Sequence, residues 1–346
     1  MKTEKDAKFK GTILIADYDF GNVDIERTII ERAGFELVAA QCKTEDEVIE
    51  HGRDADGVLA QYAPIGTRTI NAFTRCRVIA RYGTGVDIVD VDAATRRRIQ
   101  VTNAPNDWCA EEVADHAVAL WLAAARKICQ YDRGVRRGDW RWQTGYPIWR
   151  LRGRVFGLLS FGAIARSIAE RVRPFGVDIW AYDPFLDPAE IQERNVRAVS
   201  FDQLVEAADY LLIQAPLTPE TRHLFNRETL RRMKPTAVLI NTARGPIVED
   251  AALRQALVEG WIAGAAVDDI EEEPAKQRDW RPANPLFQVE NVIITPHAAY
   301  YSEESIGAVR RIAAEEAVRV LSGLPALSPV NTIPAQYGGP RHDEQR

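Results

Sequence analysis

Short apolar runs alternate with amphipathic stretches along most of the chain. In the first hundred residues the runs are continuously apolar, which is typical of strands buried on both faces of a parallel sheet. The stretches between them repeat their apolar residues with helical spacing. This alternation predicts an α/β fold whose first part is a doubly wound parallel sheet. The strands are expected at 12–17, 36–41, 57–61 and 78–82, and the helices at 23–33, 44–51 and 67–73.

The same alternation continues after residue 155. A strand at 155–159, a tight turn, a helix and a second strand at 177–182 follow one another, and Asp183 ends the second strand. This is the order of a dinucleotide-binding βαβ unit, in which the turn brings a pyrophosphate to the helix N-terminus and a later acid binds the ribose. Further strands are expected at 210–214, 237–240, 262–267 and 292–295, with helices at 188–194, 199–208, 251–260 and 302–321.

The glycine fingerprint of this turn is incomplete, because its three positions hold Ser160, Gly162 and Ala165. Gly162 is the least replaceable, since a β-carbon there would keep the backbone away from the phosphates, whereas alanine is tolerated at the third position. Ser160 stands where glycine is used for its backbone freedom, so we expect strain or an altered grip on the cofactor. An ordinary turn without a nucleotide is the alternative interpretation. The agreement of strand, turn, helix and terminal acid favours nucleotide binding.

Charged side chains follow three consecutive predicted strands. Arg244 follows the first, Asp268 the second with Glu273 shortly after, and His297 the third. The carboxyl ends of parallel strands face one crevice, so these groups are expected to converge although they are far apart in sequence. Each alone has a simpler explanation, as a surface charge, as part of the acidic run 271–273 or as a packed histidine. Their combination favours an active site.

A glycine-rich loop, RYGTGVD, ends the strand at 78–82. Gly83 and Gly85 straddle Thr84, an arrangement that exposes successive backbone N–H groups to a carboxylate, and Arg81 adds a positive charge. A plain strand-to-helix turn is an equally good interpretation of this loop.

His116 lies within the apolar helix expected at 111–126, where we predict a packed histidine with a hydrogen-bond partner rather than a catalytic one.

Composition narrows the class of protein. A chain of 346 residues with 46% hydrophobic content is expected to form two packed domains. The net charge of −6 argues against a dedicated nucleic-acid or membrane-surface protein, since both need a positive field. The N-terminus lacks the pattern of a secretory signal and no long apolar window is present, so we expect a cytoplasmic protein. Four scattered cysteines are expected to be reduced, and no metal site is predicted.

Two further segments carry expectations. Residues 139–149 concentrate aromatic side chains in a connecting segment: Trp140, Trp142, Tyr146 and Trp149. Aromatic residues and arginine are enriched at protein contacts, so a subunit contact is favoured over packing on the same domain. The polar tail 334–346, with its glycines and prolines, is expected to be disordered.

Together these motifs resemble the D-isomer-specific 2-hydroxyacid dehydrogenase family. The resemblance extends from about residue 55 to 331 and rests on RYGTGVD, EEVADHAVAL, the nucleotide turn with Asp183, APLTPET, NTARGPIVED, GAAVDDIEEEP and ITPHAAYYSEES. EEVADHA and HAAYYSEES are most similar to the branch that contains the C-terminal-binding proteins, which are NAD(H)-binding corepressors of the same fold. The resemblance implies a Rossmann NAD-binding domain at 107–300, inserted in a flavodoxin-like substrate domain formed by 1–106 and 301–333. It also implies a homodimer formed through the NAD-binding domain.

The resemblance assigns roles to particular residues. The catalytic set is Arg244, Glu273 and His297. The substrate-binding residues are Arg81, Gly83, Thr84, Gly85 and Tyr300. NAD would be surrounded by Thr84, Ser160, Phe161, Gly162, Ala163, Ile164, Asp183, Ala215, Pro216, Thr221, Thr242, Ala243, Arg244, Asp268, His297 and Tyr300.

The implied activity is the NAD-dependent interconversion of a D-2-hydroxy acid and its 2-keto acid. His297 would be the general acid and base, because imidazole titrates near neutrality. Asp183 would repel a 2′-phosphate, which favours NAD over NADP. The alternative is an NAD(H)-sensing regulator with vestigial turnover. It is suggested by the likeness to corepressors, by Ser160, and by Ala163 at a position where the family commonly has an arginine.

Overall fold

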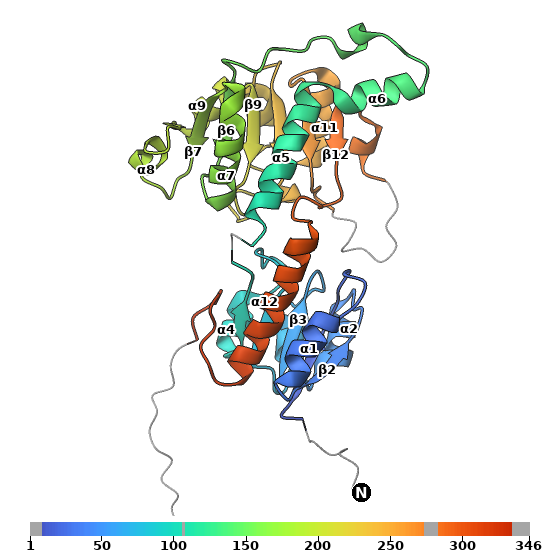
Figure 1. The fold of residues 1–346 in the computed structure, drawn as a ribbon, viewed down its shortest axis with the longest axis vertical. Helices are drawn as coiled ribbons and strands as arrows, with labels where there is room; N and C mark the ends of the chain where they lie inside the picture. The colour runs from blue at the N-terminus through green and yellow to red at the C-terminus, as the bar shows by residue number, and fades with distance from the viewer. Residues whose placement is uncertain (1–8, 106–107, 273–282, 334–346) are drawn as a thin grey trace, which may run out of the picture. The chain divides into compact units, whose positions relative to one another are not determined.

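The computed structural model describes residues 9–105, 108–272 and 283–333. Its contacts divide the chain into two compact units, unit 1 with residues 1–105 and 307–346, and unit 2 with residues 106–306. Both are α/β units (Figure 1). Within the described ranges, no helix has the length and apolar character needed to cross a membrane. The predicted disordered tail, 334–346, lies outside the described residues.

Unit 1 is built on a five-stranded parallel sheet with the strand order β2-β1-β3-β4-β5. This order is that of flavodoxin-like sheets, as expected. The strands are β1 (Thr12–Ile15), β2 (Glu36–Ala39), β3 (Gly57–Ala60), β4 (Val78–Arg81) and β5 (Gln100–Thr102). The helices are α1 (Asp24–Arg32), α2 (Glu45–Gly52), α3 (Thr67–Ala72), α4 (Val91–Arg96) and the part of α12 (Glu303–Leu321) from residue 307 onward.

A buried ion pair joins the two chain segments of unit 1. Arg310 on α12 donates to both carboxylate oxygens of Glu26 on α1, at 2.9 and 2.7 Å, and to the carbonyl oxygen of Asn22 at 2.8 Å. Both charged side chains are almost completely buried. Unpaired charges are costly in a protein interior, so this pair fixes α12 against the first helix of the chain.

Unit 2 contains a seven-stranded sheet in the order β12-β11-β10-β9-β6-β7-β8, and all its pairs are parallel. The order reverses beside β6, the strand that precedes the nucleotide turn. Such a reversal creates the crevice in which open α/β sheets bind ligands. The strands are β6 (Val155–Leu159), β7 (Asp178–Tyr182), β8 (Arg197–Ala198), β9 (Tyr210–Ile213), β10 (Val238–Asn241), β11 (Gly264–Val267) and β12 (Val292–Ile294).

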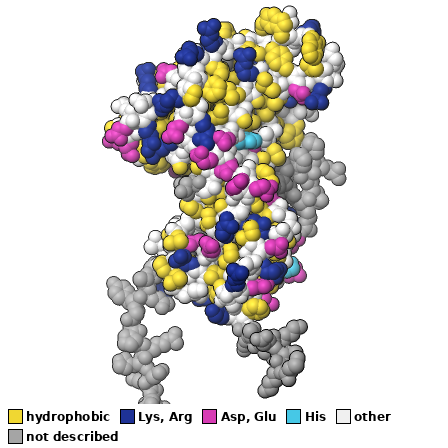
Figure 2. All heavy atoms as spheres, in the orientation of Figure 1, with side chains coloured by type: hydrophobic (Ala, Val, Ile, Leu, Met, Phe, Trp, Pro, Cys, Tyr) yellow, Lys and Arg dark blue, Asp and Glu magenta, His cyan; other side chains and the backbone are white. Residues whose placement is uncertain are grey.

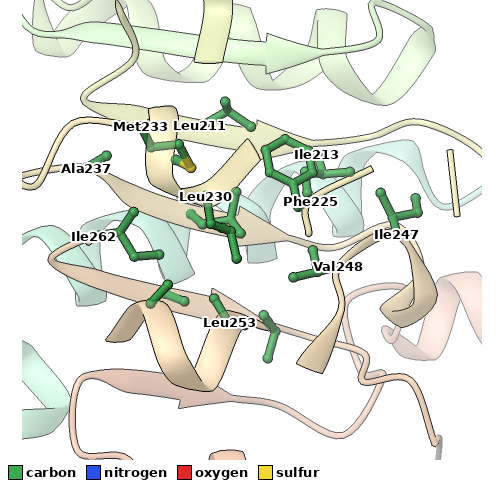
Figure 3. Packing of buried hydrophobic residues seen from close by; sticks show 14 of the residues in the cluster. Leu211, Ile213, Phe225, Leu230, Met233, Ala237, Ile247, Val248, Leu253 and Ile262 are labelled. Atoms are coloured by element: carbon green, nitrogen blue, oxygen red, sulfur yellow. The ribbon is translucent and has the colours of Figure 1, made fainter. Parts of the chain in front are cut away.

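Helices of unit 2 cover its sheet, and two apolar clusters fill the space between. One cluster packs α5 and α7 around the fully buried Trp121. The other contains side chains of β9, α10, α11 and the loops that follow β9 and β10 (Figure 3). The helices are α5 (Ala110–Ala125), α6 (Ile128–Arg136), α7 (Ala163–Val172), α8 (Pro188–Gln192), α9 (Phe201–Ala207), α10 (Arg227–Arg232) and α11 (Asp250–Glu259).

The fold class predicted from sequence is confirmed, with a Rossmann-type unit inserted in a flavodoxin-like one. The strand expected at 155–159 has those bounds, and the other expected elements differ from the observed ones by a few residues at their ends. The prediction omitted several short elements. They are α4, β5, α6, β8 and α10.

Candidate functional site

The turn after β6 is built around the conformation of Ser160. This residue has φ +75°, the left-handed region that favours glycine. Its hydroxyl donates to Asp183 Oδ2 at 3.2 Å, and the same oxygen accepts from the backbone N–H of Phe161 at 2.8 Å. The expected strain at Ser160 is therefore present, and Asp183 at the end of β7 supports the turn. The backbone reaches the shape for which the fingerprint uses glycine.

Gly162 is the N-cap of α7, and no side chain caps this helix end. Its φ of −71° and ψ of −167° are accessible to any residue, and a β-carbon built on it would meet no atom of the described residues within 4 Å. The fold itself therefore does not require glycine here. Open space in front of a helix N-terminus fits a pyrophosphate, which needs close approach to backbone N–H groups. Ala165 is buried against the core, as the third fingerprint position requires.

The loop after β9 is held in place by a threonine and by the neighbouring loop. Thr221 donates to the carbonyl oxygen of Pro216 at 2.7 Å and accepts from the N–H of Thr218 at 2.7 Å. Phe225, fully buried, then pairs through its backbone with residues that follow Arg244: its N–H donates to the carbonyl of Ile247 at 3.1 Å. The Phe225 side chain lies in the core beneath both loops (Figure 3).

The loop after β10 carries Arg244. Asn241, completely buried, donates to the carbonyl oxygen of Arg244 at 2.9 Å and accepts from the N–H of Ala243 at 3.0 Å. Thr242 accepts from Gln214 at the end of β9. A β-carbon on Gly245 would lie 2.1 Å from the carbonyl oxygen of Ile270, so only glycine fits where this loop meets the one after β11. The Arg244 backbone is thereby fixed from both sides.

Asp268 follows β11 and organises the loop that carries His297. Its Oδ1 accepts from the Thr295 hydroxyl and from the N–H of Ala298 at 3.0 Å, and its Oδ2 accepts from the N–H of Ala299 at 2.8 Å. Burial alone would raise the pKa of this carboxyl, but the hydrogen bonds from His116, Thr295 and the two backbone N–H groups outweigh it and lower the pKa to about 2. Asp268 is thus ionised at neutral pH.

His116 has the partner that the sequence predicted for a packed histidine. Its Nε2 lies 3.1 Å from the Thr295 hydroxyl and 3.5 Å from Asp268 Oδ1. The histidine of α5 therefore supports the same loop as Asp268. The sequence had singled out neither Thr295 nor Asp269, the second acid after β11. Both residues lie just after the end of a strand, and this position could have identified them from the sequence.

His297 follows β12 with a left-handed backbone at φ +53°. Its N–H donates to the carbonyl oxygen of Asp268 at 2.6 Å, and its Nδ1 lies 3.9 Å from Asp269 Oδ2. Such a backbone costs of order 1–3 kcal/mol in a non-glycine residue and is commonest at functional sites. The ring of Tyr300 meets the His297 ring edge to face at 6.0 Å, and Trp108 lies 5.9 Å from Tyr300.

Arg244, Asp268 and His297 follow the adjacent strands β10, β11 and β12, so the predicted convergence of these three strand ends is present. The turn with Ser160 and the loop with Ala215 follow β6 and β9 in the same sheet. Glu273, the third predicted catalytic residue, lies outside the described residues. The nucleotide turn and the loops that carry Arg244 and His297 thus all follow strands of one parallel sheet, at its carboxyl edge.

The substrate-binding loop predicted at 81–85 belongs to unit 1 and follows β4. Gly83 has φ +128°, and the guanidinium of Arg81 occupies the place that a β-carbon would take. Arg81 also donates to the carbonyl oxygen of Tyr82. Asn103 donates to the carbonyl oxygen of Thr84 at 2.6 Å, which fixes the tip of the loop. The backbone conformation therefore favours glycine at position 83, whereas the Arg81 guanidinium is the end of a flexible side chain that a β-carbon would displace.

Comparison with known proteins identifies the family of this chain. Residues 118–299 match the family model described as the NAD-binding domain of D-isomer specific 2-hydroxyacid dehydrogenases. A glyoxylate reductase of Korarchaeum cryptofilum is 38% identical over 283 residues, which cover 80% of this chain and 82% of the reductase. A D-3-phosphoglycerate dehydrogenase of Methanocaldococcus jannaschii is 38% identical over 305 residues, covering 88% of this chain but 56% of that longer protein.

A solved structure matches the fold of almost the whole chain. It is that of the NADPH-dependent glyoxylate/hydroxypyruvate reductase of Sinorhizobium meliloti in complex with NADP and malonate. The two are 31% identical with a TM-score of 0.79, and the match covers 92% of this chain and 96% of the reductase.

These relatives correct one expectation. They are glyoxylate reductases and phosphoglycerate dehydrogenases, so the predicted similarity to the branch with the C-terminal-binding proteins is not supported. The short motifs EEVADHA and HAAYYSEES had suggested that branch. EEVADHA contains His116, which contacts Thr295, and HAAYYSEES contains Ala298 and Ala299, whose N–H groups donate to Asp268. The chain belongs to the D-isomer-specific 2-hydroxyacid dehydrogenase family and is an NAD(P)-dependent enzyme of that type.

Proposed function

We propose that this enzyme reduces a 2-keto acid to the D-2-hydroxy acid, and catalyses the reverse oxidation, with NAD(H) as its preferred cofactor. The observation that carries the proposal is the arrangement of unit 2. An imidazole and a guanidinium follow β12 and β10, which flank β11 in the same sheet in which β6 leads into the nucleotide turn. Bound NADH supplies the hydride for C2 of the keto acid.

His297 is the proton donor in reduction and the proton acceptor in oxidation. Its ring is one-fifth exposed, while its backbone is held by Asp268. A group that exchanges a proton with substrate needs this combination of access and fixed position. Arg244 is proposed to bind the substrate carboxylate, since a guanidinium offers a planar pair of donors. Glu273 is proposed to pair with His297.

Unit 1 supplies the other substrate contacts in this proposal. Arg81 and the backbone of Gly83 to Gly85 offer positive charge and N–H donors to the carboxylate. Tyr300, in unit 2, is proposed to contact the substrate side chain, because its ring lies against that of His297. The proposal keeps the domain bounds expected from the sequence. The substrate domain comprises residues 1–106 and 301–333, and the NAD-binding domain comprises residues 107–300.

The preference for NAD rests on Asp183. The carboxylate follows β7, where the adenosine ribose binds in this type of sheet, and a 2′-phosphate would meet its negative charge. Asp183 is held there by N–H groups of Phe161 and Phe185, at 2.8 and 2.9 Å. The comparison of kcat/KM for NADH and NADPH tests this assignment. A preference for NADPH would contradict it.

The activity itself is tested with purified protein, NADH and a panel of 2-keto acids from glyoxylate and hydroxypyruvate to phenylpyruvate. Replacing His297 by alanine should lower turnover by about 10²- to 10⁴-fold, the usual contribution of a general acid. Thermal unfolding of the same variant provides the control for folding. Turnover that is unchanged in a folded His297→Ala variant would remove His297 from the mechanism.

We also propose that the enzyme is a homodimer formed through unit 2. α6 and the segment after it lie along one edge of this unit, where Figure 2 shows exposed hydrophobic side chains. Trp140, Trp142 and Tyr146 are 86%, 64% and 64% exposed, far more than such large side chains usually are. Light scattering after size exclusion tests the proposal, and charged substitutions at Trp140 and Trp142 should yield monomers.

A further inference from the structure

Two neighbouring carboxylates, Asp268 and Asp269, follow β11, and both are buried. The family motif and the sequence pattern drew attention only to the first of them. Two adjacent buried acids at the end of one strand carry a high desolvation cost, so each needs compensating interactions. The structure gives each acid a different set of neighbours.

The carboxylate of Asp268 is hydrogen-bonded to the loop after β12. Its two oxygens accept from the Thr295 hydroxyl and from the N–H groups of Ala298 and Ala299, and His116 lies beside it at 3.5 Å. The contact that Asp268 makes with His297 is through its main-chain carbonyl, which accepts from the His297 N–H. Asp268 therefore shapes the loop, and its carboxylate is engaged elsewhere than at the imidazole.

Asp269 faces the imidazole instead. Its Oδ2 lies 3.9 Å from His297 Nδ1 and accepts from the N–H of Gly245 at 3.1 Å. The carboxylate is 4% exposed, so its charge is little screened by water. A negative charge beside Nδ1 favours a proton on that nitrogen and leaves Nε2, on the far side of the ring, to exchange its proton with a ligand.

Asp269 also reaches the loop that carries Arg244. Gly245 is the next residue, and its backbone is pressed against that of Ile270, which follows Asp269 in the chain. One carboxylate thus touches the ends of β10 and β12 while it stands at the end of β11. The guanidinium and the imidazole are carried by loops that share this anchor.

We propose that Asp269 is a positioning residue, which orients His297 and fixes its placement relative to Arg244. The proposal rests on the proposed role of His297 in proton transfer. Among the described residues of unit 2, the His297 ring also faces the ring of Tyr300. The Asp268 carboxylate accepts a hydrogen bond from the N–H of Ala298, the residue after His297.

The test is Asp269→Asn, which keeps an acceptor for the Gly245 N–H and removes the charge. We expect kcat for keto-acid reduction to fall about tenfold at neutral pH, KM for NADH to stay within about twofold, and the alkaline limb of the pH–rate profile to move about one unit lower. A profile that superimposes on that of the wild type would overturn the proposal. Asp269→Ser gives the same comparison should the asparagine variant not fold.

A matched control is Asp209→Asn. Asp209 is equally buried in unit 2 but precedes β9, at the opposite end of the strands, where it accepts from the N–H of Val155 at 2.9 Å and pairs with Lys234. This variant should lose stability and keep the pH–rate profile of the wild type. A profile shift of the same size in Asp209→Asn would show that the effect of Asp269→Asn is general, and it would overturn the proposal.

A double-variant cycle separates this proposal from the role of His297. If Asp269 acts through His297, then Asp269→Asn should lower turnover in the wild type and have almost no effect in the His297→Ala background. Equal losses in both backgrounds would show that Asp269 acts independently and would refute the proposal. If His297→Ala alone keeps full turnover, the proposed function of His297 fails, whatever the result at Asp269.

Discussion

Replacing Gly162 by alanine should weaken cofactor binding strongly while it changes the stability of the fold little. The backbone angles at this position suit alanine, and within the described part of the chain the added methyl group meets no atom closer than 4 Å. The free energy of unfolding should therefore change by less than about 1 kcal/mol, the scale of substitutions at a helix N-cap. If the space in front of α7 receives the pyrophosphate, the same methyl group must instead collide with the bound cofactor.

The size of the binding loss follows from the hydrogen bonds at stake. A backbone N–H that donates to a charged oxygen contributes about 1.5–3 kcal/mol. Pushing the phosphate away from one such donor should weaken NADH binding by about 10- to 150-fold. Titration calorimetry on the wild type and on Gly162→Ala measures this ratio, and thermal unfolding of the cofactor-free proteins measures the stability change.

Gly260 provides the control for this experiment. Among the described residues, a β-carbon on it also meets no atom within 4 Å, but its φ is +73°, at the C-terminus of α11. Gly260→Ala should cost about 1 kcal/mol of stability, because alanine resists the left-handed conformation, and should leave NADH affinity unchanged. The reasoning is refuted if Gly162→Ala binds NADH as tightly as the wild type, or if its main effect is on stability.

Three further predictions concern charged groups. Glu26→Gln should cost about 3–5 kcal/mol in urea unfolding, because Arg310 stays buried without its partner, whereas Glu31→Gln, in an exposed pair, should cost less than about 1 kcal/mol. The ionised Asp268, with a pKa of about 2, contributes about 2 kcal/mol of stability that is present above pH 4 and is lost as the pH falls through 2. In the Asp268→Asn variant, the free energy of unfolding should therefore fall less steeply as the pH is lowered from 4 to 2. Asp183→Ser should raise the ratio of kcat/KM for NADPH to that for NADH by at least about tenfold, as the repulsion of a 2′-phosphate is removed; an unchanged ratio would remove Asp183 from cofactor selection.

The strands and the order of the site residues could be predicted because both depend on short-range patterns. A parallel strand buried on both faces is a continuous apolar run, and the residue after it lies at the ligand-binding edge of the sheet. This rule located Arg244, Asp268 and His297 without any knowledge of contacts. The strain at Ser160 was likewise predictable, since the turn demands a conformation that only glycine adopts without cost.

The neighbours of each side chain could not be predicted in the same way. Asp268 and Asp269 are identical residues in adjacent positions, and only the three-dimensional arrangement shows that one holds a backbone while the other faces the imidazole. The left-handed backbone of His297 follows a proline and has no signature in the sequence. Short elements such as β8, with two residues, are fixed by their neighbours in the sheet rather than by their own pattern.

The ion pair between Glu26 and Arg310 has a consequence for how the protein is made. The two residues are separated by 284 positions, so the ribosome produces the whole of unit 2 between them. Until Arg310 emerges, the carboxylate of Glu26 lacks the arginine that accompanies it in the interior of unit 1, so its burial is costly. A chain that ends before residue 310 is therefore expected to fold unit 1 less stably than the full chain does.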